Sequence, residues 1–337
     1  MRTEQLDYDL PTELIAQAPA EPRDAARLLV YDRASATRRH RHFRDLVDEL
    51  RDDDVVVVNA TKVLPVRVHA RRPTGGRAEV LLIEPRGDGT WEALARPLRK
   101  LTPGTRLVAA AGLEIEIGER LEAGRVLVRP IAPGTLEEAL GEVGEMPLPP
   151  YIRERSADPE RYQTVYARTA GSAAAPTAGL HFTPELFAAV RERCTVVEVD
   201  LRIGLDTFRP VLADDFDAHE MHSEAYAIDA GVRAMLGEAR AAGRRVVAVG
   251  TTTARVLETV ADAAAPDVGR TRLKIQPPYR FGMVDALVTN FHLPRSTLLA
   301  LVMAFAGEEA TRRLYEEAVK ERYRFYSFGD AMLITEC

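Results

Sequence analysis

The sequence predicts an α/β protein, in which a barrel-like α/β domain carries an inserted small all-β domain, an antiparallel barrel. From residue 151 onward, predicted strands and helices alternate, as in a parallel sheet with crossover helices. Between residues 67 and 147, about six short strands follow one another with almost no helical period. We therefore expect residues 1–66 and 148–337 to form a discontinuous α/β domain around an insert of residues 67–147.

Length and composition are those of a globular protein with room for two modules. The chain has 337 residues, of which 46% are hydrophobic and 28% are charged. The 45 Lys and Arg residues against 51 Asp and Glu residues give a formal charge of −6. This charge excludes a general nucleic-acid binder, so any such role requires local basic patches.

Cysteine content and hydropathy indicate the cellular compartment of the protein. Cys194 and Cys337 are the only cysteines, too few for a disulfide framework or a zinc site. The N-terminus has no apolar signal-peptide core. The longest apolar run, Leu298–Ala306, is far shorter than the ~20 residues of a membrane span. We expect a soluble, cytoplasmic protein that does not associate with membranes.

The first part of the chain predicts the start of a sheet. Leu29–Tyr31 predicts a short strand, and apolar residues at helical spacing predict a helix within Phe43–Leu50. The continuous apolar run Val55–Val58 predicts a strand buried on both faces. In the insert, Thr74–Arg77 and Gly87–Thr90 predict turns between strands.

The remaining elements follow from periodicity. The predicted helices are Thr135–Val143, Ala230–Ala242, Ala254–Ala264, Ser296–Ala306 and Glu308–Tyr323. The predicted strands after residue 151 are Thr195–Ile203, Arg245–Val249, Leu273–Gln276 and Val284–Asn290. In such folds, ligands bind beyond the carboxyl ends of the strands.

One small, nearly uncharged stretch has the composition of a pocket wall: Gly171-Ser-Ala-Ala-Ala-Pro-Thr-Ala-Gly-Leu-His-Phe-Thr183. Glycine and alanine let a ligand or another backbone approach closely, and His181 is the one titratable group. The alternative is an ordinary tight loop that leads into a helix, because Thr183-Pro184 makes a good N-cap and first helical residue.

A second stretch, Gly250-Thr-Thr-Thr-Ala-Arg255, follows a predicted strand and opens a helix. Free backbone N–H groups, threonine hydroxyls and the helix dipole favour an anion there, and Arg255 adds a fixed charge. The spacing differs from that of a nucleotide-triphosphate loop, so a carboxylate or a single phosphate fits better. The alternative is simple helix capping with an exposed arginine.

Further polar groups lie at predicted strand ends or near them. Asn290, His292 and Arg295 follow a strand, although a single histidine there is often structural. Tyr323–Asp330 offers four aromatics, which stack on a purine or fill the core. His219–His222 has the spacing of a metal pair, but no further ligand cluster lies nearby in sequence, so we expect no metal.

In combination, these motifs resemble one family closely: the S-adenosylmethionine:tRNA ribosyltransferase-isomerases of queuosine biosynthesis. The matching motifs are Tyr8-Asp-Leu-Pro11, Thr74-Gly-Gly76, Met146-Pro-Leu-Pro-Pro-Tyr-Ile152, Tyr162-Gln-Thr-Val-Tyr166, Ala175-Pro-Thr-Ala-Gly-Leu-His-Phe182, His219-Glu-Met-His-Ser-Glu224, Gly250-Thr-Thr252, Val284-Asp-Ala-Leu-Val-Thr-Asn-Phe-His-Leu-Pro294 and Gly329-Asp-Ala-Met332. The family's fold, a barrel-like α/β domain with an inserted β-barrel, agrees with the predicted architecture.

The resemblance implies a reaction. Such enzymes transfer the ribosyl part of S-adenosylmethionine to 7-aminomethyl-7-deazaguanine at the wobble position of a tRNA. They release adenine and methionine, leave an epoxycyclopentanediol (epoxyqueuosine) and use no metal. S-adenosylmethionine would then be the ribosyl-donor substrate, and the partner would be a tRNA with a GUN anticodon. We expect a monomer.

The resemblance also implies catalytic roles. The sulfonium acidifies the C5′ protons of the ribose, so a base is needed, and His181 or His292 is the candidate. Loss of adenine develops positive charge on the ribose, which Asp206, Glu224 or Asp330 would stabilise.

Binding roles follow in the same way. The methionine carboxylate suits the helix start at Thr251 together with Arg255. The substrate-binding candidates are Pro176, Thr177, Gly179, Arg202, Thr251, Thr252, Thr253, Arg255, Asn290 and Phe291. The tRNA-contact candidates are Arg38, Arg39, Arg41, Lys62, Arg67, Arg71, Arg72 and Arg77, although basic runs are usually solvated faces.

The chain departs from the family pattern at predicted strand ends. Arg202 and Asp206 stand where the family usually has histidine and glycine, and Lys62 stands where it has arginine. Gln276-Pro-Pro278 replaces Tyr-Pro-Gly. Arginine removes a possible base and adds a permanent charge, and lysine loses bidentate binding.

Three hypotheses therefore remain open. The first is the standard ribosyltransferase-isomerase. The second is a paralogue that binds S-adenosylmethionine but acts on another acceptor, for which Arg202 and Asp206 could form a new recognition pair. The third is a non-catalytic relative that binds RNA or a ligand, which the retained His181, Thr251–Thr253 and His292 favour least.

Overall fold

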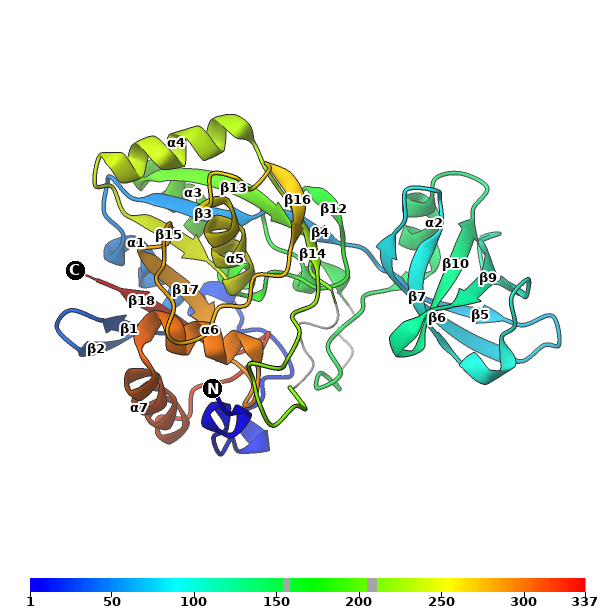
Figure 1. The fold of residues 1–337 in the computed structure, drawn as a ribbon, viewed down its shortest axis with the longest axis horizontal. Coiled ribbons are helices and arrows are strands. Elements are labelled where there is room, and N and C mark those ends of the chain that lie inside the picture. Colours follow the sequence, from blue (N-terminus) through cyan, green and yellow to red (C-terminus); the bar gives the residue numbers. More distant parts are fainter. Residues whose placement is uncertain (154–157, 205–210, 337) are drawn as a thin grey trace.

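The chain folds into two parts that lie side by side. The computed structural model describes residues 1–153, 158–204 and 211–336. A large α/β domain holds both ends of the chain, and a separate β-barrel extends from one side of it (Figure 1). The predicted fold class, an α/β domain with an inserted antiparallel barrel, is confirmed.

A nine-stranded mixed sheet is the centre of the large domain. Its strand order is β16-β14-β13-β3-β15-β17-β18-β1-β2. The strands are β1 Arg27–Asp32, β2 Thr37–His42, β3 Val55–Asn59, β13 Thr195–Leu201, β14 Glu224–Ile228, β15 Val246–Val249, β16 Val268–Thr271, β17 Ala286–Asn290 and β18 Ala331–Thr335. The four central strands β13, β3, β15 and β17 run parallel, so their carboxyl ends meet at one edge.

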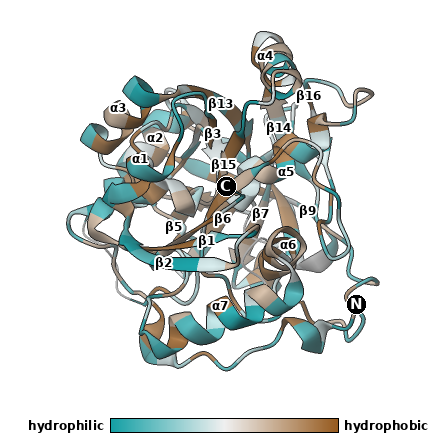
Figure 2. Ribbon diagram, turned by 90° about the vertical axis from the view of Figure 1, so that its left-hand side faces the viewer, coloured by the Kyte–Doolittle hydropathy of each residue, from teal (hydrophilic) through white to brown (hydrophobic). Residues whose placement is uncertain are grey.

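Helices cover both faces of this sheet. They are α1 Leu46–Glu49, α3 Pro184–Arg193, α4 Ala230–Ala241, α5 Thr251–Val260, α6 Thr297–Ala306 and α7 Glu308–Lys320. Val55 and Val57 pack in the core under α4 to α7, whereas Val56 and Val58 pack under α1 and α3. The prediction that this strand is buried on both faces is confirmed. Figure 2 shows the hydrophobic strands at the centre between helices of mixed colour.

The barrel closes on itself. Its strands are β5 Arg67–Arg71, β6 Arg77–Pro85, β7 Trp91–Arg96, β8 Arg106–Val108, β9 Glu114–Arg120, β10 Arg125–Ile131 and the short β11 Gly144–Glu145, with the helix α2 Leu136–Val143. Each neighbouring pair is antiparallel, and a contact between β5 and β8 closes the ring. Alternating apolar residues such as Val68, Val80 and Ile115 fill the interior. A two-stranded parallel pair, β4 Thr61–Val63 with β12 Thr169–Ser172, lies at the junction of the two parts.

Two predicted elements differ from the structure. The helix predicted from Ala254 begins at Thr251, with Gly250 as its N-cap residue. The strand predicted at Leu273–Gln276 was wrong, because the strand ends at Thr271. The side chain of Lys274 donates instead to the carbonyls of Phe216 and His219, which binds this segment to a neighbouring loop.

Candidate active site

Three segments far apart in sequence meet beyond the carboxyl ends of the central strands. They are the 3-10 helix Thr177–His181, the start of α5 and the end of β17. Together they enclose a small cavity of about 30 Å³. Predicted candidates that line it are Pro176, Thr177, Thr251, Thr252, Asn290 and His292. A neighbouring cavity of about 30 Å³ adds Phe291 and shares Thr177, Asn290 and His292.

Asn290 joins two of these segments. Thr177 Oγ1 donates to Asn290 Oδ1 at 3.0 Å, and Asn290 Nδ2 donates to the carbonyl of Tyr326 at 3.2 Å. The same Nδ2 lies 3.1 Å from His181 Nε2, so this ring nitrogen is the acceptor and the ring carries its proton on Nδ1. His181 therefore fixes the orientation of the Asn290 amide.

The two candidate bases occupy different surroundings. The His181 ring packs against Phe43 with the ring centres 4.8 Å apart, and His181 is not among the lining residues of the cavities described here. His292 lines both small cavities, and its Nε2 lies 2.7 Å from Thr289 Oγ1. Burial lowers the pKa of both histidines to about 3, and Arg324 and Arg23 add to the effect at His181. Both rings are therefore neutral near pH 7.

Other candidates of this region have structural roles. Gly179 packs directly on the Tyr166 hydroxyl and leaves no room for a Cβ. Thr253 is fully buried, and its hydroxyl donates to the carbonyl of Val249 at 2.7 Å. Neither residue lines the small cavities.

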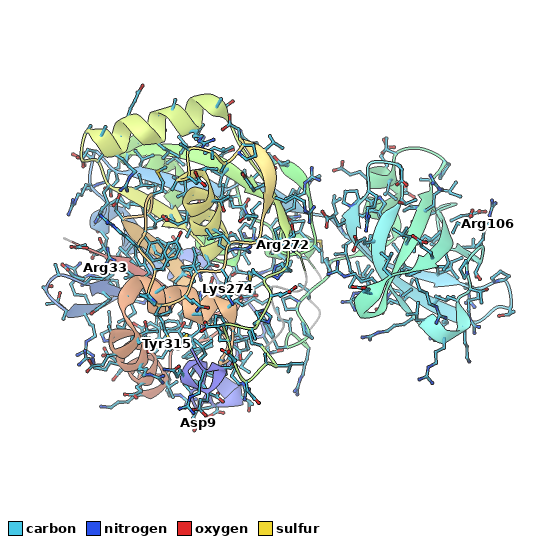
Figure 3. The ribbon with its side chains drawn as sticks, in the orientation of Figure 1. Asp9, Arg33, Arg106, Arg272, Lys274 and Tyr315 are labelled. Atoms are coloured by element: carbon cyan, nitrogen blue, oxygen red, sulfur yellow. The ribbon has the colours of Figure 1, made fainter. Side chains whose placement is uncertain are left out.

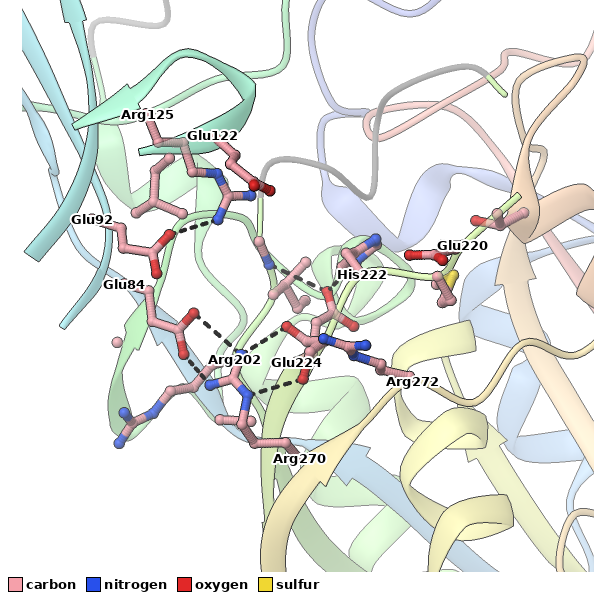
Figure 4. A pocket seen from close by; sticks show the side chains of 18 of the residues that line it. Glu84, Glu92, Glu122, Arg125, Arg202, Glu220, His222, Glu224, Arg270 and Arg272 are labelled. Carbon is pink, nitrogen blue, oxygen red and sulfur yellow. Dashed lines mark hydrogen bonds and ion pairs between the residues drawn. The ribbon is translucent and has the colours of Figure 1, made fainter. Parts of the chain in front are cut away.

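A much larger cavity lies between the two domains. Its volume is about 580 Å³, within the range of small-molecule sites. The barrel contributes Glu84, Glu92, Glu122 and Arg125, and the large domain contributes Arg202, His219–Ala225, Arg270 and Arg272. Figure 4 shows these charged side chains facing the same space. Ile203 lines both the large cavity and a small one, so the two spaces adjoin.

Glu224 is a buried carboxylate at the wall of the large cavity. Its Oε2 is paired with Arg255, and its Oε1 lies 3.0 Å from His222 Nε2. Burial alone would raise the pKa of Glu224, but Arg255 and His222 outweigh it and hold the pKa at about 2. Glu224 is therefore ionised near neutral pH. Arg255 is buried against it, not exposed as a simple capping residue would be.

Two polar residues that are not among the predicted site residues connect the strand ends. Asn59, fully buried at the end of β3, donates to the carbonyl of Leu201 at 3.1 Å and contacts Thr252 Oγ1 at 3.4 Å. Ser172 Oγ contacts Thr61 Oγ1 at 2.5 Å and accepts from the Ile203 N–H at 2.9 Å. The predicted strand end before Asn59 was the available signal for the first residue.

Several predicted residues lie elsewhere. Asp330 is buried at the start of β18, where it accepts from the N–H groups of Arg27 and Arg324. Arg38, Arg39 and Arg41 lie on the edge strand β2, far from the barrel. Asp206 falls outside the described residues.

The arginine candidates on the barrel lie on β5, on β6 or in the turn between them. Arg71 and Arg77 are exposed, whereas Arg67 and Arg72 are partly buried. Arg67 lies 3.7 Å from Glu79, and Arg71 is opposite Arg77 in the strand register. Lys62 lies on β4 and is partly buried. Among the described residues, no three His, Cys, Asp or Glu side chains gather closely enough to bind a metal ion. Within the same residues, no helix is both long and apolar enough to cross a bilayer.

Comparisons with known proteins place the chain in one family. Residues 3–334 match the sequence model of a family described as queuosine biosynthesis protein. A protein from Moorella thermoacetica named S-adenosylmethionine:tRNA ribosyltransferase-isomerase is 52% identical, over 99% of this chain and 100% of its own length. Proteins with the same name from Rubrobacter xylanophilus and Thermus thermophilus are 54% and 53% identical, over 99% and 98% of this chain and 98% and 99% of their own lengths.

A solved structure agrees with these relatives. The crystal structure of an S-adenosylmethionine tRNA ribosyltransferase from Thermotoga maritima is 40% identical, with a TM-score of 0.57. The match covers 98% of this chain and 99% of the other. The chain therefore belongs to the queuosine biosynthesis protein family of S-adenosylmethionine:tRNA ribosyltransferase-isomerases.

Proposed function

We propose that this chain transfers and isomerises the ribosyl group of S-adenosylmethionine onto 7-aminomethyl-7-deazaguanine at the wobble position of tRNA. The products would be epoxyqueuosine in the tRNA, adenine and methionine. The observation that carries the proposal is the convergence of three separate segments on one site beside a cavity of about 580 Å³. The relatives named for this activity favour it over a changed acceptor or a non-catalytic role.

In this proposal, S-adenosylmethionine enters the large cavity with its ribose toward His292. His292 is the base that takes the C5′ proton, because it lines the small cavities that adjoin the large one. A neutral imidazole is ready to accept a proton, although its lowered pKa makes it a weak base. His181 would act through Asn290, as a positioning residue.

A carboxylate is needed where the ribose develops positive charge as adenine leaves. Glu224 fits this role best, since it is ionised and lines the large cavity. Asp330 is a weaker candidate, because both its oxygens accept backbone N–H groups. Arg255 is paired with Glu224, so the methionine carboxylate would rely on the α5 N-terminus at Thr251 and Thr252.

For tRNA contact, the barrel arginines are better candidates than the basic strand β2. Arg38 and Arg39 on β2 are already paired with Glu317 and Glu49, which reduces their attraction for phosphate. Arg71 and Arg77 lie exposed at one end of the barrel, with the partly buried Arg72 beside them. We propose that they meet the stem of a tRNA with a GUN anticodon, and that the chain acts as a cytoplasmic monomer without a metal.

The rate of adenine release tests both the proposed function and the assignment of His292 as the general base. The chain is incubated with S-adenosylmethionine and an anticodon stem-loop RNA that carries the 7-aminomethyl base, and free adenine is followed. We expect release by the unmodified chain and a loss of about 10²–10⁴-fold in His292→Gln, the usual size of a general-base effect. The matched control is His40→Gln on the remote strand β2, for which we expect an unchanged rate. No adenine from the unmodified chain overturns the function, and an equal rate in His292→Gln overturns the base assignment.

A further inference from the structure

The register of three strands places three arginines along one edge of the large cavity. The backbone N–H of Arg202, just after β13, donates to the carbonyl of Ala225 on β14 at 2.9 Å. Arg270 on β16 is opposite Ala225 from the other side, and Arg272 follows two residues later. Residues opposite each other, or two apart on one strand, share a face of the sheet. All three arginines therefore lie on the face that borders the cavity (Figure 4).

The middle arginine of the three is already neutralised. Both guanidinium ends of Arg270 bind Glu84 of the barrel, and its Nε donates to Ser223 Oγ at 2.9 Å. Two other carboxylates of the cavity are neutralised in the same way. Glu92 binds Arg86 and Arg125, and Glu224 binds Arg255. Because they are paired, Arg270, Glu92 and Glu224 have little free charge with which to bind a ligand.

Arg202 and Arg272 differ from these pairs. Both side chains are exposed, and neither forms an ion pair with any residue in the described ranges 1–153, 158–204 and 211–336. The Arg202 side chain also lies over Gly171, where an added Cβ would be 3.2 Å from its Nε. Gly171 has a φ of +138°, which side chains rarely adopt, so the backbone there suits this close approach. Figure 3 places Arg272 on the side of the large domain that faces the barrel.

The spacing of the two arginines indicates the kind of anion. Arg202 directly follows β13 and Arg272 directly follows β16, with β14 between the two strands, and neighbouring strands lie about 4.8 Å apart. The backbones of Arg202 and Arg270 are thus about 10 Å apart, and Arg272 lies two residues, about 7 Å, further along the chain. Two separated cations on an open rim match two negative charges along one ligand strand better than they match a single small carboxylate.

We propose that Arg202 and Arg272 bind two backbone phosphates of the RNA strand that carries the modified base. This inference rests on the proposed function and adds a contact surface to it. Arginine suits phosphate because its planar guanidinium donates in pairs. Exposed Glu122 and Glu220 on the same cavity would repel the strand and restrict it to the rim at the sheet edge.

The test measures the salt dependence of RNA binding. The affinity of a labelled anticodon stem-loop with the 7-aminomethyl base is measured against KCl concentration for the intact chain, Arg202→Gln, Arg272→Gln and the double variant. Each lost phosphate contact should reduce the slope of log affinity against log salt by about 0.7, the value for single strands. Arg202→Lys and Arg272→Lys keep the charge and should keep the slope. The control Arg313→Gln, on the exposed face of α7, should leave it unchanged.

The affinity for S-adenosylmethionine, measured without RNA, shows whether the two arginines bind RNA phosphates or the methionine carboxylate. We expect it to be unchanged in both glutamine variants. Weaker binding of S-adenosylmethionine with an unchanged RNA slope would assign the arginines to the methionine carboxylate and overturn the proposal. No change in either measurement also overturns it. The salt slope of RNA binding could depend on both arginines in a chain that releases no adenine. That result would uphold the phosphate contacts and overturn the proposed function.

Discussion

At the scale of single residues, burial decides how the site groups ionise. His181 and His292 lose the hydration that stabilises an imidazolium, so both stay neutral. Glu224 keeps its charge in spite of burial, because Arg255 and His222 are its partners. The sequence indicates His292 by its place after a strand and His181 by its stretch of small residues, and the resemblance to the family implies Glu224. It could not show that Arg255 pairs with Glu224, because the two are 31 residues apart and lie on different elements.

The buried histidines predict acid sensitivity of the fold. Each has a folded-state pKa near 3 and an ordinary value of 6.5, so the unfolded chain binds more protons between these values. The free energy of unfolding should then fall as the pH falls below 6.5, by on the order of 1 kcal/mol per pH unit for each histidine. Urea unfolding at pH 7.5 and pH 5 measures this. His292→Gln should show about 1–2 kcal/mol less difference between the two pH values. If the free energy of unfolding changes equally between the two pH values in both proteins, the lowered pKa of His292 is refuted.

At the scale of elements, a strand was predictable where its residues share one environment. Val55–Val58 reads as a buried strand because both faces are covered. Strand β2, Thr37–His42, is not predictable from its pattern, which is that of a basic run, because an exposed edge strand needs no apolar residue. Periodicity alone predicts the start of α5 three residues late, at Ala254, since threonine has a low helix propensity and only its position after β15 favours a helix.

The amino ends of the central strands are held by a buried ion pair remote from the site. Asp54, just before β3, accepts from Arg245 Nε at 2.9 Å and from Nη2 at 2.6 Å, and both side chains are buried. Asp54→Ala leaves the arginine unpaired, so we expect a loss of about 3–5 kcal/mol in the free energy of unfolding. The matched control Asp52→Ala removes an exposed carboxylate from the same loop and should cost less than about 1 kcal/mol. Similar losses in urea titrations of the two variants would contradict this account.

At the scale of the whole molecule, two domains together border the large cavity. The presence of an all-β insert was predictable, because the sequence changes from alternating helices and strands to short strands alone. The large cavity between the two domains was not visible. It is bordered by Glu84 and Arg270, which lie 186 residues apart and pair across the domain boundary. No local pattern encodes such a contact, since it follows from how the barrel docks against the sheet edge.

The most direct test of the account is the identity of the nucleoside that the chain makes. The intact chain is incubated with S-adenosylmethionine and tRNA that carries 7-aminomethyl-7-deazaguanine at the wobble position. The tRNA is then digested, and the mass of the modified nucleoside is measured together with free adenine. We predict the epoxycyclopentanediol nucleoside, with one adenine released for each nucleoside formed. Recovery of the unchanged 7-aminomethyl nucleoside from a chain that binds both substrates would contradict the account.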